Sequence, residues 1–153
     1  MDYSKYQLVY EGDFAMNHMD LITGFVDVSK YNGVTSPDYR VFILHEKESV
    51  PDYYLAFLQM GYINKLFFPF GRGAAHIGRW RLPTSAFNEF LAPCPPKSEQ
   101  KEIAQYITSN LERMTELEEK AQSAIKLMQE RRTALISAAV TGKIDVRNWQ
   151  APQ

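Results

Sequence analysis

The sequence predicts an α+β protein, in which a mixed α/β domain is followed by one long coiled-coil helix. Residues 1–96 hold 18 of the 20 aromatic residues and seven of the eight prolines. Residues 97–141 contain no glycine, no proline and one aromatic residue, Tyr106. Along this second segment apolar or small residues recur at alternating spacings of four and three if Asn110 and Arg131 fill two gaps, which is the pattern of a coiled-coil helix. We therefore expect a domain over 1–96, a helix over 97–142 and a tail over 143–153.

Short strands are predicted within the first segment. Residues 6–10, 24–29 and 39–44 are rich in β-branched and aromatic side chains. The dipeptides Gly12-Asp13 and Asn32-Gly33 favour turns between these strands.

One helix and one loop complete the first segment. A helix is expected over 52–60, because Pro51 suits a first helical turn. Residues 66–78 contain three glycines and one proline, so we expect a loop there.

The second segment predicts a helix from about Ser98 to Thr141, roughly 65 Å long at 1.5 Å per residue. Pro95 and Pro96 precede it, Ser98 is expected to cap it, and Gly142 is expected to end it. Its apolar stripe is the predicted dimer interface. The stripe comprises Ile103, Ile107, Asn110, Met114, Leu117, Ala121, Ala124, Met128, Arg131, Leu135 and Ala138.

A helix of this length needs another long helix to cover its stripe. Folding back over its own domain is the alternative, and it would require a domain about as long as the helix. In a parallel pair, Arg131 would face its own copy, so an antiparallel pair is favoured. Two antiparallel registers, centred near residues 119 and 123, remain open.

Composition limits the compartment and the partners. The single cysteine, Cys94, fits a reducing compartment, and neither a signal peptide nor a membrane span is predicted, so we expect a cytoplasmic protein. The net charge is −1, but residues 60–96 carry Lys65, Arg72, Arg79 and Arg81 against one acidic residue. Such local clustering favours an anionic partner more than the total charge does.

No catalytic or metal-binding constellation is predicted. His18, His45 and His76 lack metal-ligand spacing, and one cysteine cannot complete a zinc site. The run Gly71–His76 is a near miss of a dinucleotide-binding fingerprint without its strand-to-helix context. We therefore predict that the chain is not an enzyme.

Three stretches resemble the specificity subunits of type I restriction–modification systems. The domain-to-helix junction at 90–103 has a proline-rich step followed by Glu99, Gln100 and Ile103, and the helix end at Leu135–Arg147 is also similar. The stretch Gly12–Phe42 matches a pattern inside the family's target recognition domain. The matching residues are Gly12, Asp13, Asn17, Met19, Gly24, Gly33, Val34, Ser36, Pro37 and Tyr39.

The resemblance implies a recognition domain that reads half of a split double-stranded DNA target and a helix that docks a methyltransferase subunit. A restriction subunit would join that complex. S-adenosylmethionine, ATP and magnesium would belong to these partners, and this chain would hold no cofactor. Family members carry two such domains and two helices, whereas this chain has one of each. The match also begins partway into the domain, so a few dozen N-terminal residues are expected to be absent.

These departures favour a homodimer that rebuilds the two-domain layout. The alternatives are a recognition-domain remnant that dimerises without binding DNA, and a small-molecule or peptide-binding module on a coiled coil. For the DNA-binding reading, the basic residues Lys65, Arg72, Arg79 and Arg81 are expected to face phosphates; ordinary surface charge is the alternative. A second set, Asn17, Ser36, Tyr39 and Arg40, is expected to help read DNA; turn formation and a core role for Tyr39 are the alternative.

Overall fold

The computed structural model describes residues 6–74, 79–147 and 149–150, and it divides into two compact units, 1–107 and 108–153. The α+β class and the long C-terminal helix are confirmed. The elements, in chain order, are β1 (Gln7–Val9), β2 (Phe14–Asn17), β3 (Val26–Val28), β4 (Gly33–Thr35), β5 (Tyr39–Phe42), α1 (Pro51–Ile63), η1 (Phe68–Phe70), β6 (Arg72–Ala74), β7 (Arg79–Arg81), α2 (Thr84–Glu89) and α3 (Lys97–Val140).

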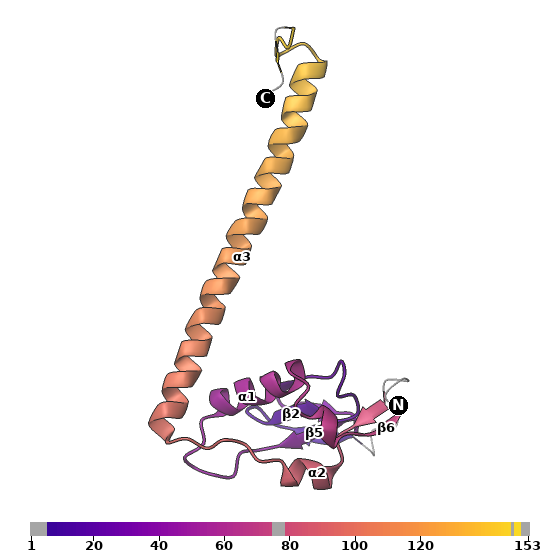
Figure 1. Ribbon diagram of the computed structural model, residues 1–153, viewed down its shortest axis with the longest axis vertical. Coiled ribbons are helices and arrows are strands. Elements are labelled where there is room, and N and C mark those ends of the chain that lie inside the picture. Colours follow the sequence, from indigo (N-terminus) through magenta and orange to yellow (C-terminus); the bar gives the residue numbers. More distant parts are fainter. Residues whose placement is uncertain (1–5, 75–78, 148, 151–153) are drawn as a thin grey trace. The chain divides into compact units, whose positions relative to one another are not determined.

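Three small antiparallel sheets build the first unit (Figure 1). The largest has the order β3-β2-β5, and the other two are the ribbons β1-β4 and β6-β7. The predicted strands at 6–10, 24–29 and 39–44 are confirmed as β1, β3 and β5. The central strand β2 was not predicted, and neither were β4, β6, β7 and α2.

The core lies on one face of the central sheet. Phe14 and Met16 of β2 are almost fully buried there, and Phe14 stacks on Phe42 of β5 with ring centroids 5.2 Å apart. From α1, Leu58 and Tyr62 join this cluster. From α2, Phe87 packs against Phe42 at 5.2 Å. The central sheet and the helices α1 and α2 therefore share one largely aromatic core.

Helix α1 begins at Pro51, one residue before the expected start, and proline suits this position because a first helical turn does not use the N–H that proline lacks. Near its end, Gly61 lies against the ring of Phe67, and an added Cβ would come within 2.6 Å of that ring. The loop that follows α1 can therefore pack closely against this helix only because residue 61 is a glycine.

Helix α3 begins at Lys97, one residue before the predicted start. The N–H of Gln100 donates to the carbonyl of Pro96 at 3.0 Å, so Pro96 holds the capping position. The expectation that Ser98 caps the helix is wrong, because Ser98 lies inside the first turn.

Helix α3 ends at Val140, two residues before Gly142, which was predicted to end it. Gly142 has a φ of 73°, a conformation that only glycine adopts at little cost. The N–H of Gly142 donates to Ala139, and the N–H of Lys143 donates to Ala138 at 2.8 Å. These two bonds form a Schellman motif, which satisfies carbonyls that the helix leaves free.

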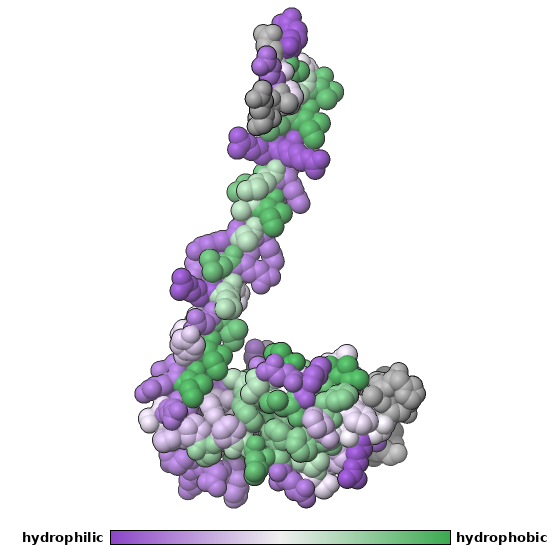
Figure 2. Space-filling model, in the orientation of Figure 1, coloured by the Kyte–Doolittle hydropathy of each residue, from purple (hydrophilic) through white to green (hydrophobic). Residues whose placement is uncertain are grey.

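Every residue from 111 to 137 on α3 is exposed. Along this stretch hydrophobic and hydrophilic side chains alternate on the surface (Figure 2). Within the described part of the chain, no helix combines the length and the hydrophobicity that crossing a membrane requires.

Candidate nucleic-acid interface

Arg40 lies on the core side of the central sheet. In the strand register Arg40 stands opposite Met16, so its side chain shares the inner face with that buried residue. Its Nη2 donates to the carbonyl of Leu82 and to the hydroxyl of Thr84, both at 3.2 Å. The guanidinium carbon lies 4.5 Å from the ring centre of Phe87. Protein contacts therefore hold this predicted DNA-binding side chain in place.

His18 lies beside this arginine. Its Nδ1 and the Nη1 of Arg40 are both buried, and neither has a hydrogen-bond partner among the described residues. Burial lowers the pKa of His18 below its usual value of 6.5, the positive charges of Arg40 and Arg81 lower it further, and Asp38 opposes them. Burial and the two arginines therefore favour the neutral form of the His18 ring.

A shallow depression of about 490 Å³ opens next to Arg40. Its apolar wall includes Phe42 and Phe87. We call it the Gln7 depression. Its polar groups come from β1, the loop after β2, β5 and α2, and they are Gln7, His18, Tyr39, Arg40, Thr84 and Asn88.

The ribbon β6-β7 places two arginines in direct opposition. Arg72 pairs with Arg81 in the strand register, and both side chains are exposed. No ion pair with a carboxylate involves either of them within the described residues. Like charges directly across a ribbon repel each other, so a bound anion would stabilise this pair.

The loop before β6 is held by Trp80 of β7. Its indole N–H donates to the carbonyl of Phe68 at 2.8 Å. A Cβ added at Gly71 would lie only 2.3 Å from the indole nitrogen. The side chain of Arg79, which was predicted to face phosphate, lies outside the described part of the chain. Residues 75–78 of the predicted loop, including His76, also lie outside it.

Lys65 is the other basic residue of the predicted phosphate-facing set. It has a φ of 58°, which is uncommon for a residue with a Cβ. Its exposed Nζ donates to the carbonyl of Ile22. The lysine thus ties the end of α1 to the loop after β2.

Asn17 and Ser36 build turns. The Oδ1 of Asn17 accepts hydrogen bonds from the N–H groups of Met19 and Asp20 at 3.1 and 3.2 Å. The hydroxyl oxygen of Ser36 accepts one from the N–H of Asp38 at 3.3 Å. Both residues therefore shape the loops next to the depression.

The structure brings together only part of the predicted DNA-binding set. Tyr39 and Arg40 both line the Gln7 depression, whereas Arg72 and Arg81 share the β6-β7 ribbon. The depression also includes Gln7, Thr84 and Asn88, which sequence reasoning did not single out. No sequence signal could have found Gln7, because its position depends on strand pairing across 28 residues, from Gln7 to Thr35.

The predicted dimer stripe has two environments. Within the first unit, Ile103 and Ile107 line a small apolar depression of about 200 Å³ together with Tyr53, Phe57 and Met60. From Met114 to Leu135 the stripe is exposed; Met114, Leu117 and Met128 are 64%, 56% and 69% exposed.

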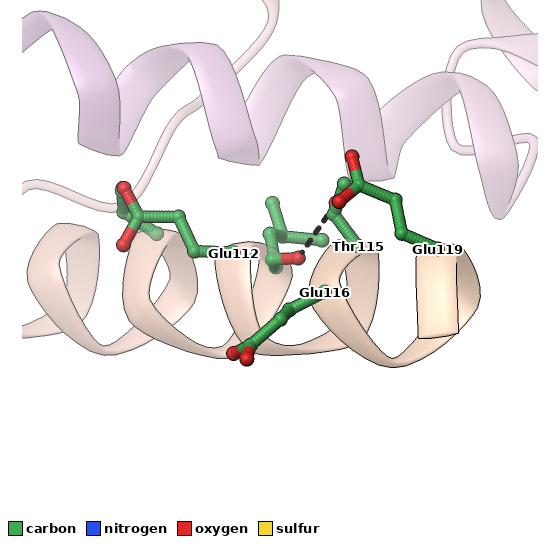
Figure 3. Close-up of a pocket in the computed structure, with 6 residues that line it drawn as sticks. Glu112, Thr115, Glu116 and Glu119 are labelled. Carbon is green, nitrogen blue, oxygen red and sulfur yellow. Dashed lines mark hydrogen bonds between the residues drawn. The ribbon is translucent and has the colours of Figure 1, made fainter. Parts of the chain in front are cut away.

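The first part of α3 is acidic. Glu112, Glu116 and Glu119 follow one another along it, and the side chain of Glu116 points away from the other two (Figure 3). The hydroxyl of Thr115 donates to the carbonyl of Leu111 at 3.0 Å and so carries no free donor outward. Among the described residues, no group of three or more His, Cys, Asp or Glu side chains is placed to hold a metal ion.

The chain thus combines an α+β domain with an aromatic core, an exposed arginine ribbon and one long helix that is exposed over most of its length. The family model for the type I restriction modification DNA specificity domain matches residues 5–127. The chain therefore belongs to this family, and its role is that of a specificity subunit, a class that is generally not catalytic. No curated protein matches the chain.

Proposed function

We propose that the chain acts as a homodimeric DNA specificity subunit, whose two copies pair through antiparallel α3 helices. The observation that carries this proposal is the exposed apolar stripe of α3. Large side chains such as Leu117 and Met128 would leave water in a helical pair, and burying a side chain of this kind contributes about 1.5–3 kcal/mol.

The charge distribution of α3 favours the antiparallel orientation. Residues 97–119 hold six acidic and three basic residues, a formal charge of −3. Residues 120–140 hold one acidic and four basic residues, a formal charge of +3. Antiparallel pairing places the negative half of each helix beside the positive half of the other, whereas parallel pairing places like charges together.

The residues that flank the stripe favour one of the two registers. With the centre at residue 119, Glu118 would approach Glu118 of the second copy, and Lys120 would approach Lys120. With the centre between residues 122 and 123, the same two side chains would approach Ile125 and Leu127 of the second copy. We propose the second register, because it avoids both like-charge contacts.

This register also gives the apolar depression at the start of α3 an occupant. Ile107 would pair with Ala138 of the second copy, next to Tyr53 and Phe57. Both the stripe and the depression would then be covered by the same helix.

Two identical domains related by a two-fold axis read identical half-sites. The DNA target should therefore be an interrupted palindrome, whose gap depends on the length of α3. The helical pair would dock methyltransferase subunits, and a restriction subunit would join them. S-adenosylmethionine, ATP and magnesium would be held by those partners.

The test is methylation of duplexes with varied gaps by the chain and a cognate methyltransferase subunit. Deleting residues 118–124 removes one heptad, or about 10 Å of helix. The preferred gap should shrink by about three base pairs, since a base pair rises roughly 3.4 Å, while the half-sites stay the same. A target without a palindrome, or a gap that does not change with helix length, would refute the symmetric dimer.

A further inference from the structure

The side-chain amide of Gln7 is held in one orientation at the Gln7 depression. Its Nε2 donates to the carbonyl of Tyr39 at 3.0 Å. This bond uses one of the two N–H groups of the amide. The second N–H and the Oε1 have no partner among the described residues. A fixed amide thus presents an adjacent donor and acceptor.

That pair of groups matches one nucleobase. In the major groove adenine offers the N7 acceptor next to the N6 amino donor, and a glutamine amide binds both at once. Guanine offers two acceptors there, which suit an arginine instead. Free groups on Gln7 would therefore distinguish adenine from guanine.

Arg40 is the competing base reader in the same depression, and its contacts argue against that role. Its Nη2 is bonded to Leu82 and Thr84, its Nη1 is buried, and its flat face covers Phe87. A guanidinium in these contacts cannot present its two-donor edge to guanine. By contrast, the Oε1 and the second N–H of Gln7 make no hydrogen bond to the described residues.

The surroundings of Gln7 suit a DNA groove. Gln7 begins the two-stranded ribbon β1-β4, and the major groove admits a ribbon of this kind. Thr35 stands directly opposite Gln7, so its hydroxyl and methyl groups share the same side of the ribbon. Asn88 supplies a second, exposed amide at the depression. Arg81 lies nearby, since the neighbouring N–H of Leu82 donates to the carbonyl of His18 at 2.9 Å.

We propose that Gln7 determines specificity in the DNA-binding surface by contacting N6 and N7 of one adenine in each half-site, with Tyr39 fixing the amide through its carbonyl. This proposal rests on the proposed DNA-binding function. It adds the identity of the base and of the side chain that reads it.

The test uses the full chain with its methyltransferase subunit. Selection from a random duplex library gives the half-site of the wild type. Each adenine in turn is then replaced by 7-deazaadenine, which lacks the N7 acceptor. At one position this should weaken binding by about 5- to 10-fold, the lower end of the range for a bidentate base contact, because only the hydrogen bond to N7 is lost. In Gln7→Leu, the same replacement should weaken binding less than about twofold. Gln105→Leu, an exposed glutamine on α3, serves as the matched control and should keep the full effect.

The outcomes separate the two proposals. If the wild type selects no sequence, the proposed function fails and this assignment fails with it. If the wild type selects a half-site but the effect of 7-deazaadenine is the same in Gln7→Leu, only the adenine assignment fails. A dependence on 7-deazaguanine that disappears in Gln7→Leu would also overturn it. A Gln7→Leu variant that melts normally but binds no duplex would show a general role and overturn it as well.

Discussion

The N–H of Val50 donates to the Oε1 of Gln100 at 2.9 Å, across fifty residues of sequence. The Nε2 of the same glutamine donates to the carbonyl of Pro95 at 2.8 Å. Gln100 is 1% exposed. One amide therefore connects the residue before α1, the proline-rich step and the first turn of α3.

Replacing this amide should destabilise the first unit. In Gln100→Leu the N–H of Val50 and the carbonyl of Pro95 would both lose their partner, and a buried unpaired polar group costs about 1–3 kcal/mol. Urea denaturation should show a loss of about 2–4 kcal/mol in the free energy of unfolding. Gln105→Leu on the exposed side should change it by less than about 0.5 kcal/mol. Equal stabilities for the two variants would contradict this account of Gln100.

Gly71→Ala should disturb the arginine ribbon. The added Cβ would overlap the indole of Trp80, which is fixed by its bond to the carbonyl of Phe68. Overpacking of this kind costs typically 1–3 kcal/mol, measurable as a lower melting temperature. Gly33→Ala is the matched control, because nothing lies within 4 Å of a Cβ built there. A normal melting temperature for Gly71→Ala would show that the loop moves aside at little cost.

Neutralising the opposed arginines should flatten the salt dependence of DNA binding. If Arg72 and Arg81 each contact a phosphate, the double change to Gln should reduce the slope of log affinity against log salt by about two units. The apparent affinity should fall for all duplexes alike. Lys126→Gln on α3 should leave the slope unchanged. An unaltered slope in the arginine variant would mean that this ribbon does not touch DNA.

The α3 stripe should determine the oligomeric state. Charged side chains at Leu117 and Met128 would oppose burial of the seam, so the double change to Asp should give a monomer by light scattering. Ser109→Asp with Thr133→Asp adds the same charge outside the stripe and should leave a dimer. If the Leu117/Met128 variant stays dimeric, the two copies pair through another surface.

His18 should make stability depend on pH. Its folded pKa lies below 6.5, so between the two values the unfolded chain binds more protons than the folded one. Its contribution is therefore fully present above pH 6.5 and is lost as the pH falls through the folded pKa. Arg40 and Arg81 favour the neutral ring, and Asp38 opposes them. The decline between pH 7 and pH 5 should be smaller in His18→Gln, as measured by urea denaturation; an identical decline would place its cause elsewhere.

The sequence predicted elements whose signals are local. Helix α3 was found because its apolar spacing and its closing Gly142 are both visible along the chain. Strand β2 was missed because Phe14–Asn17 contains no β-branched residue and only four residues; tertiary packing decides its conformation. Asn32-Gly33 indicated a turn, but Gly33 is the first residue of β4, because its pairing with Val9 determines its extended conformation.

The candidate site shows the same limit more strongly. Arg40 was expected to help read DNA, and only the pairing with Met16 reveals that its side chain faces the core. Gln7 carried no signal, because its amide acquires a fixed orientation only when Tyr39 lies beside it. The local sequence pattern thus predicts where helices and strands lie. The position of a side chain that could contact a ligand depends on how the strands pair, which the local pattern does not show.

The ribbon β1-β4 contributes Val9 to the buried core and nothing to its central cluster. Leu8 and Val34, which stand opposite each other, are 63% and 54% exposed. Substitutions at such positions remove little buried apolar surface, and the folded state tolerates them. Natural selection can therefore test new side chains on this ribbon without approaching the stability threshold of the domain. If the ribbon reads DNA as proposed, a lineage of such proteins could change its target sequence by small steps, each of which leaves a folded intermediate.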